Sequence, residues 1–107
     1  MEKALRLVEE NMENPEFSVN NLCDDLGMSR SQLYRKFESI TGLTPNDFIR
    51  SVRLKRAAQL LRGSSYNISE ISDRVGFNSI KYFNKYFKEE FGFTPTQYRS
   101  NGSGETK

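Results

Sequence analysis

Apolar residues recur every three or four positions along most of the chain, which is the period of an amphipathic helix. Ser, Thr or Asn precedes several of these stretches and Gly or Pro follows them, so the pattern divides into separate helices. The predicted helices cover residues 2–14, 18–27, 29–40, 45–62, 68–75, 79–91 and 94–98. The sequence therefore predicts an all-α fold, with a disordered tail at residues 101–107, where no apolar period is found.

Each predicted helix has an apolar face that should pack into a core. These faces carry Leu5, Val8 and Met12 on the first helix, Val19, Leu22 and Leu26 on the second, Leu33, Phe37 and Ile40 on the third, and Phe48, Val52, Ala57, Leu60 and Leu61 on the fourth. The fourth helix should be about 27 Å long, begin at Pro45 and end before Gly63. If it is continuous, it packs against the elements on both sides of it in the chain.

Two stretches of the chain are near-copies of one another. Residues 18–48 read SVNNLCDDLGMSRSQLYRKFESITGLTPNDF, and residues 67–98 read NISEISDRVGFNSIKYFNKYFKEEFGFTPTQY. The alignment pairs Val19, Leu22, Leu26 and Gly27 with Ile68, Ile71, Val75 and Gly76, and, after a one-residue insertion, Ser29, Leu33, Arg35, Phe37, Gly42, Thr44, Pro45 and Phe48 with Ser79, Phe83, Lys85, Phe87, Gly92, Thr94, Pro95 and Tyr98. One structural unit has been used twice.

Each copy consists of a short helix, a turn at a glycine and a longer helix, which is the spacing of a helix-turn-helix motif. The motifs are predicted at residues 18–41 and 68–91, with the linker helix at residues 45–62. A chain of 107 residues is large enough for one domain with a core and small for two, so we expect both motifs to share one domain over residues 1–100. The recognition helices, 29–40 and 79–91, could then enter successive major grooves about 34 Å apart.

Charge is distributed unevenly, although the formal net charge is only +2. Residues 1–28 hold two basic and seven acidic side chains, whereas residues 29–99 hold thirteen basic and six acidic ones. The basic excess begins with the first recognition helix, as expected if this part of the protein faces a polyanion. A solvated basic surface without a partner is the alternative that charge alone leaves open.

The faces opposite the apolar stripes of the recognition helices are the candidates for base contacts. They carry Arg30, Ser31, Tyr34, Arg35 and Glu38 on helix 29–40, and Ile80, Lys81, Asn84, Lys85 and Lys88 on helix 79–91. Arg and Lys pair with guanine, Asn pairs with adenine, and apolar or aromatic groups meet the thymine methyl. Two such faces in duplicated motifs favour DNA binding over a merely solvated surface.

The second copy has the pattern I..I...VGF.S..YF...FK...G.TP..YR, and this pattern resembles the signature of the AraC/XylS family of bacterial transcription regulators. The segments LCDDLGMSRSQLYRKF and TGLTPNDFIRSVRLKRAAQLL are similar to the first motif and connecting helix of that family. The resemblance covers residues 1–100 and implies a seven-helix DNA-binding domain with two motifs, usually at the C-terminus of a longer regulator. GMSRSQLYRKF and RLKRAAQLL also resemble the output domains of hybrid two-component sensor regulators.

The resemblance implies the position of each base-reading residue in this sequence. These residues are Arg30, Ser31, Tyr34 and Arg35 in the first recognition helix, and Ile80, Lys81, Asn84 and Lys85 in the second. Ser31 and Ile80 depart from the residue types that the family often has there, and Arg35 is the strongest candidate. Phosphate contacts are expected from the first amides of the recognition helices and from Ser29, Ser79, Arg53, Lys36 and Lys88.

The composition argues against an enzyme, a metal site and a bound cofactor. The chain has no histidine, and its one cysteine, Cys23, cannot form a zinc site or an intramolecular disulfide and is expected to be a small core residue. The adjacent acidic residues at positions 24–25 and 89–90, two aspartates and two glutamates, are interpreted as solvated surface charge rather than as catalytic carboxylates. The alternative to DNA binding is a helical protein-interaction module whose basic faces bind an acidic partner.

Double-stranded DNA is the expected partner, and RNA polymerase is a further candidate. No apolar run reaches the roughly 20 residues that span a bilayer, and a single cysteine suits a reducing compartment, so we expect a cytoplasmic domain without membrane contact. No sensing or dimerising part is visible, so we expect dimerisation through domains absent from this chain, as in a fragment of a longer regulator.

Overall fold

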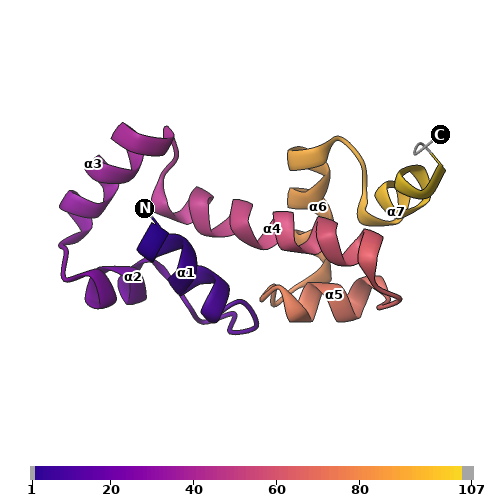
Figure 1. The fold of residues 1–107 in the computed structure, drawn as a ribbon, viewed down its shortest axis with the longest axis horizontal. Helices are drawn as coiled ribbons and strands as arrows, with labels where there is room; N and C mark the ends of the chain where they lie inside the picture. The colour runs from indigo at the N-terminus through magenta and orange to yellow at the C-terminus, as the bar shows by residue number, and fades with distance from the viewer. Residues whose placement is uncertain (1, 105–107) are drawn as a thin grey trace.

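The computed structural model describes the backbone of residues 2–104 and the side chains of residues 2–100. In this part of the chain the fold is all-α, and seven helices follow one another without a strand (Figure 1). They are α1 (Glu2–Glu10), α2 (Val19–Leu26), α3 (Arg30–Thr41), α4 (Pro45–Gly63), α5 (Ile68–Arg74), α6 (Ile80–Phe91) and α7 (Pro95–Gly104). The predicted fold class is confirmed.

Helix α4 is the central element of the molecule and contacts α1, α3, α5, α6 and α7 (Figure 1). The Thr44 hydroxyl caps its start by accepting a hydrogen bond from the Asp47 amide at 3.2 Å, and Pro45 fixes the first turn. Its N-terminal half packs against the first helix-turn-helix unit and its C-terminal half against the second. Because the buried face changes sides along the helix, α4 has no single apolar stripe.

The helix-turn-helix units are α2 with α3 and α5 with α6. Gly27 and Gly76 lie in the turns with φ of 68° and 83°, in the left-handed region that favours glycine. Ser29 and Ser79 precede the recognition helices α3 and α6 in extended conformation and cap them, as the capping pattern predicts. Figure 1 shows α3 beyond the start of α4, whereas α6 crosses its C-terminal half.

The N-terminal helix differs from its prediction in length and in orientation. It ends at Glu10 rather than at residue 14, where the Asn11 side chain donates a hydrogen bond to the Leu7 carbonyl at 2.8 Å and a turn follows. Ala4 and Val8 are buried, whereas Leu5 is 39% exposed, so the prediction of a buried Leu5 is wrong.

Helix ends account for the remaining differences. Ile40, predicted to be buried, is 55% exposed because α3 extends beyond the elements that cover Leu33 and Phe37. Gly63 is the last residue of α4 rather than the residue after it, and Ser64 is the cap. Helix α7 extends to Gly104, past the predicted end at Tyr98, so residues 101–104 of the predicted tail have helical backbone and only residues 105–107 lie outside the described part.

Candidate nucleic-acid interface

Helix α3 buries one face and leaves the opposite face to solvent. Leu33 and Phe37 are at most 1% exposed, which fixes the rotation of the helix. The four predicted base-reading residues lie together on the other side, three of them exposed and one half-buried: Arg30, Ser31, Arg35 and Tyr34. The structure therefore brings these side chains to one surface, which we call the α3 face.

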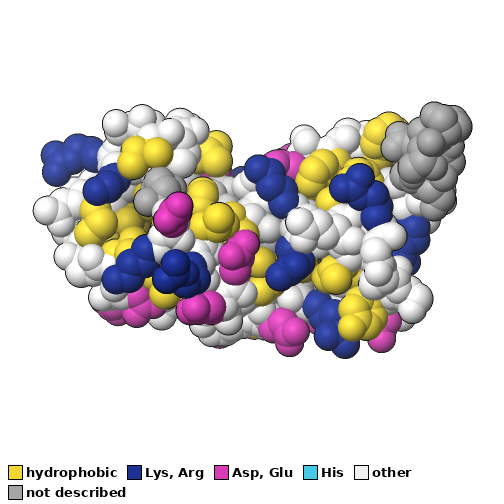
Figure 2. Space-filling view, in the orientation of Figure 1, with side chains coloured by type: hydrophobic (Ala, Val, Ile, Leu, Met, Phe, Trp, Pro, Cys, Tyr) yellow, Lys and Arg dark blue, Asp and Glu magenta, His cyan; other side chains and the backbone are white. Residues whose placement is uncertain are grey.

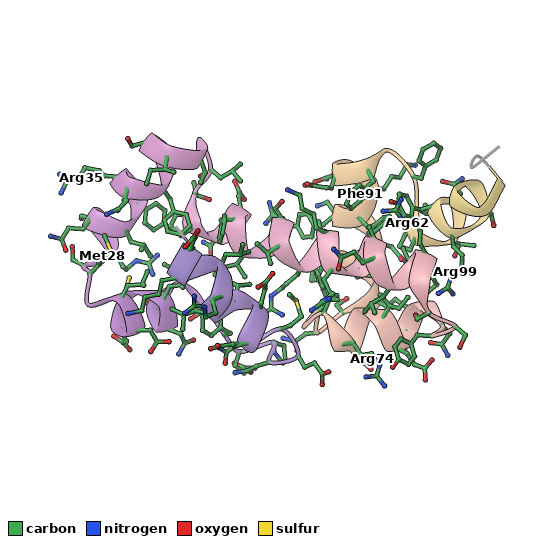
Figure 3. All side chains as sticks on the ribbon, viewed as in Figure 1. Met28, Arg35, Arg62, Arg74, Phe91 and Arg99 are labelled. Carbon is green, nitrogen blue, oxygen red and sulfur yellow. The ribbon has the colours of Figure 1, made fainter. Side chains whose placement is uncertain are left out.

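The two arginines of the α3 face differ in how they are held. Figure 3 shows Arg35 pointing outward from α3 at the end of the molecule, and no hydrogen bond or ion pair engages it within the described residues. Arg30 donates to Asn20 Oδ1 at 2.9 Å and to the Tyr34 hydroxyl at 3.3 Å. Arg35 can reach a base edge without breaking an existing contact, whereas Arg30 would have to give up its hydrogen bonds to Asn20 and Tyr34.

Helix α6 repeats this arrangement with different chemistry. Phe83 and Phe87 are fully buried, and the predicted reading residues are all exposed on the other side: Ile80, Lys81, Asn84 and Lys85. We call these four residues the α6 face. Sequence reasoning did not single out Tyr82, an aromatic residue of α6 that is 56% exposed; its ring lies 6.4 Å from that of Tyr86, on a different side of the helix from Ile80 and Asn84. The only signal for it was an aromatic residue outside the buried stripe.

The starts of α3 and α6 are suited to a phosphate. The Ser29 hydroxyl accepts from the Gln32 amide at 3.2 Å, and the Ser79 hydroxyl accepts from the Tyr82 amide at 3.4 Å. Each hydroxyl keeps its own hydrogen for donation to an anion, at the positive end of a helix dipole. Lys36 and Lys88, the other predicted phosphate contacts, are exposed farther along the same helices.

Arg53 contradicts its predicted role as a phosphate contact. It is 5% exposed, and its guanidinium donates to the backbone carbonyls of Met12, Asn14 and Val75 at 2.8 to 2.9 Å. Burial lowers the pKa of Arg53 from its ordinary value. A side chain with its donors used inside the core cannot bind a phosphate at the surface, so the prediction for Arg53 is wrong.

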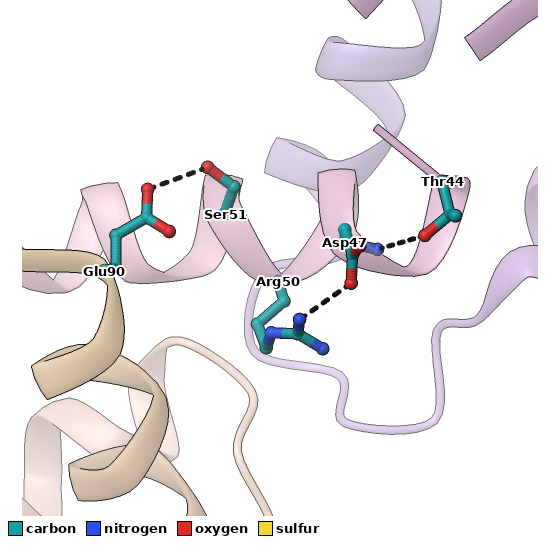
Figure 4. Close-up of polar contacts among 5 residues, drawn as sticks. All are labelled: Thr44, Asp47, Arg50, Ser51 and Glu90. Atoms are coloured by element: carbon teal, nitrogen blue, oxygen red, sulfur yellow. Dashed lines mark hydrogen bonds and ion pairs between the residues drawn. The ribbon is translucent and has the colours of Figure 1, made fainter. Parts of the chain in front are cut away.

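Polar contacts along α4 also join it to α6 (Figure 4). Ser51 donates to Glu90 at 3.3 Å, and Arg50 pairs with Asp47 at 2.7 Å while its guanidinium lies 4.3 Å from the centre of the Tyr86 ring. Arg50 is therefore engaged inside the domain. The exposed cations Lys55 and Arg56 remain on this helix.

In the view of Figure 2, acidic side chains lie mostly over α1 and along the lower edge of this face, with basic side chains among them. Further basic side chains lie at the α3 end and over the half that contains α5 to α7. Within the described residues, none of the helices combines the length and the apolar composition that crossing a bilayer requires. In the sequence, residues 29–99, which contain both recognition helices, carry thirteen basic and six acidic side chains.

Comparison with known proteins gives one family and several relatives. A family profile described as a helix-turn-helix domain matches residues 22–101. A protein of Formosa agariphila named histidine kinase P4 is 48% identical over 103 residues, which cover 96% of this chain and 8% of that protein. The chain spans between 29% and 35% of the length of three further curated relatives. It therefore corresponds to a part of these longer proteins.

Solved structures with the same fold include two DNA-binding or response-regulator domains. The DNA-binding domain of AdpA, described as a global transcriptional factor in complex with a target DNA, has a TM-score of 0.86 and 27% identity, covering 98% of this chain and 96% of that one. The C-terminal domain of AraT, a response regulator from Geobacillus stearothermophilus, has a TM-score of 0.86 and 26% identity, covering 94% and 83%. Both similarities extend over the two helix-turn-helix units and α4.

Proposed function

Because this chain belongs to the AraC/XylS family of helix-turn-helix proteins, we propose that it binds double-stranded DNA in a sequence-specific manner and thereby regulates transcription. The observation that supports this most is the pair of capped recognition helices, each with a buried apolar face and an exposed polar or basic one, held by one helix. The AdpA domain, which has the same fold, is described in complex with DNA.

The α3 and α6 faces enter successive major grooves in this proposal. Helix α4 has 19 residues, about 28 Å of length, and the molecule is 44 Å along its longest axis. These dimensions suit the roughly 34 Å between adjacent major-groove segments on one side of a duplex. The base contacts come from the eight residues of the α3 and α6 faces, and the phosphate contacts come from Ser29, Ser79, Lys36 and Lys88.

The domain acts by binding rather than by catalysis, as the output part of a longer signal-responsive regulator. The relative named as a histidine kinase and the response regulator AraT support an origin in two-component signalling. A DNA partner places the domain in the cytoplasm, where RNA polymerase is also available to it. Dimerisation belongs to other parts of the full-length protein.

In vitro selection of duplexes from a random pool tests the proposal, with affinities then measured by fluorescence anisotropy. Arg35→Ala should lose about 1 to 3 kcal/mol on the selected duplex and much less on a scrambled one, because a base contact is removed. Lys36→Ala is the matched control, since loss of a phosphate contact weakens binding to both duplexes alike and lowers the salt slope by about one. A pool that yields no preferred sequence would overturn the proposed function.

A further inference from the structure

The apolar core of the domain is divided into two clusters. The first cluster joins α1, α2 and α3 to the start of α4, and it contains Ala4, Val8, Phe17, Val19, Leu22, Cys23, Leu33, Phe37 and Ile49. The second joins α5, α6 and Met12, from the segment between α1 and α2, to the rest of α4, and it contains Met12, Leu54, Ala57, Ala58, Leu61, Ile71, Val75, Phe83 and Phe87. Val52, which is half-buried, packs against both. Next to it on α4 is Arg53, a buried cation at the boundary between the two clusters.

The Arg53 guanidinium joins backbone segments from both halves of the molecule. Its Nη1 atom donates to the Met12 and Val75 carbonyls, each at 2.8 Å, and Nη2 donates to the Asn14 carbonyl at 2.9 Å. Met12 and Asn14 lie between α1 and α2, in the first half. Val75 is the first residue after α5, in the turn that leads to α6 at Ile80. One side chain of the linker helix thus connects the first half to the turn that aims the second recognition helix.

The second turn is shaped to accept this guanidinium. A Cβ atom on Gly76 would lie 1.3 Å from Arg53 Nη1 and 2.5 Å from the Met12 carbonyl oxygen. At the equivalent Gly27 of the first unit, a Cβ atom would meet nothing within 4 Å. Both turns need a glycine for their positive φ, but only the second also needs the space. The space at Gly76 is therefore specific to the bridge that Arg53 forms.

We propose that Arg53 is a positioning residue that fixes the spacing and relative orientation of the α3 and α6 faces, and so sets how far apart two half-sites must lie; this inference rests on the proposed function. Hydrogen bonds from a buried charged group are strong and directional. The polar links between α4 and α6 themselves, Ser51 with Glu90 and Arg50 with Tyr86, lie toward the surface, where such contacts contribute less. Arg53 acts through the backbone and touches no DNA.

The first experiment measures how affinity depends on the distance between the half-sites of the selected duplex. Insertion of a few base pairs should weaken binding of the wild-type protein by about tenfold or more, because a rigid domain cannot follow the second half-site around the helix. Arg53→Lys and Arg53→Met should lose less than about threefold on the same insertion, with unchanged affinity for each isolated half-site. Arg56→Met removes a cation from the surface of the same helix and should keep the wild-type spacing profile.

Two results of this experiment would overturn the inference. One is an unchanged affinity of the wild-type protein for the duplex with inserted base pairs, a result that can be obtained without any variant. The other is an Arg53→Lys variant that is folded by circular dichroism and keeps the wild-type dependence on spacing. If Arg53→Met does not fold, Arg53→Lys alone is sufficient to test the inference.

A second experiment needs no DNA and therefore separates this inference from the proposed function. Spin labels at Ser39→Cys on α3 and Glu89→Cys on α6, both exposed positions, report the distance between the recognition helices by pulsed electron resonance, with Cys23 replaced by Ala. The distance distribution should be about twofold broader in Arg53→Lys than in the parent, and equal widths would overturn the proposal. A broader distribution in a protein that selects no DNA sequence would support the positioning role and reject only the DNA-binding one.

Discussion

In the first helix-turn-helix unit the buried Phe37 ring packs edge-on against one aromatic ring, that of Phe48, at 5.0 Å. In the second unit the equivalent ring, Phe87, contacts Phe83, Phe91 and Tyr98, with centroid separations between 4.6 and 5.8 Å. Each buried cluster holds two phenylalanines, but more aromatic rings pack around the second cluster than around the first: Tyr66, Phe77, Tyr86, Phe91 and Tyr98 against Tyr34 and Phe48. Two copies of one backbone unit are therefore packed by different means.

The turns of the two units also differ in the groups that surround them. The first turn is open around Gly27, and its backbone is completed within the unit, whereas the second surrounds a guanidinium that comes from α4. The first recognition helix has a reciprocal cap, in which Gln32 Oε1 also accepts from the Ser29 amide at 3.0 Å, and the second has a single longer bond. The duplicated sequence pattern thus preserves the shape of the unit, although only the second turn encloses a side chain of the linker helix.

The largest effect is expected from removing the central ring of each unit. Phe87→Ala should lower the free energy of unfolding by about 5 kcal/mol and Phe37→Ala by about 3 kcal/mol, because the larger cavity forms where more rings lose contact. Urea denaturation of both variants measures this difference. Equal losses would show that the aromatic cluster of the second unit adds nothing beyond buried area.

The second-largest difference between the units is expected from replacing the glycine of each turn by alanine. Gly76→Ala should cost about 4 kcal/mol, since left-handed strain adds to displacement of the bonded Arg53 guanidinium, whereas Gly27→Ala should cost about 1 to 2 kcal/mol from strain alone. Thermal and urea denaturation check both values. If the two substitutions are equally costly, the space at Gly76 has no energetic role, and the asymmetry between the turns disappears.

The serine caps should give the smallest difference. Ser29→Ala should cost about 1 kcal/mol and Ser79→Ala about 0.5 kcal/mol, because only Ser29 belongs to a reciprocal cap. The same denaturation measurement applies, with Ser39→Ala on the exposed part of α3 as the control for loss of a serine hydroxyl. A larger loss for Ser79→Ala than for Ser29→Ala would contradict this ranking.

Local signals in the sequence predicted most of the fold. The caps at Ser29, Thr44 and Ser79 act over three residues of chain, and the left-handed glycines at 27 and 76 depend only on their own backbone, so short stretches of sequence define them. The α3 and α6 faces followed from the 3.6-residue period, because Leu33, Phe37, Phe83 and Phe87 fix the rotation of both helices. The DNA contacts of these faces remain a prediction.

Burial that depends on distant partners could not be predicted. Arg53 lies in a basic helix with Arg50, Lys55 and Arg56, and nothing in the sequence distinguishes it from them. Its partners are 22 and 41 residues away for the carbonyls of Val75 and Met12. Leu5 was misplaced for a related reason, since the neighbours of α1 rather than its own pattern decide which side faces α4.

The Arg53 bridge has a consequence for how binding of a charged ligand would respond to salt. Among the described residues no carboxylate pairs with Arg53, and its positive charge is stabilised in the interior by the dipoles of the carbonyls that it donates to. Mobile ions screen charges that face water and have little access to a buried contact of this kind. Raising the ionic strength should therefore lower the affinity for a polyanion while the domain stays folded. The dependence of the affinity on salt would then report the number of counterions released, without a contribution from unfolding.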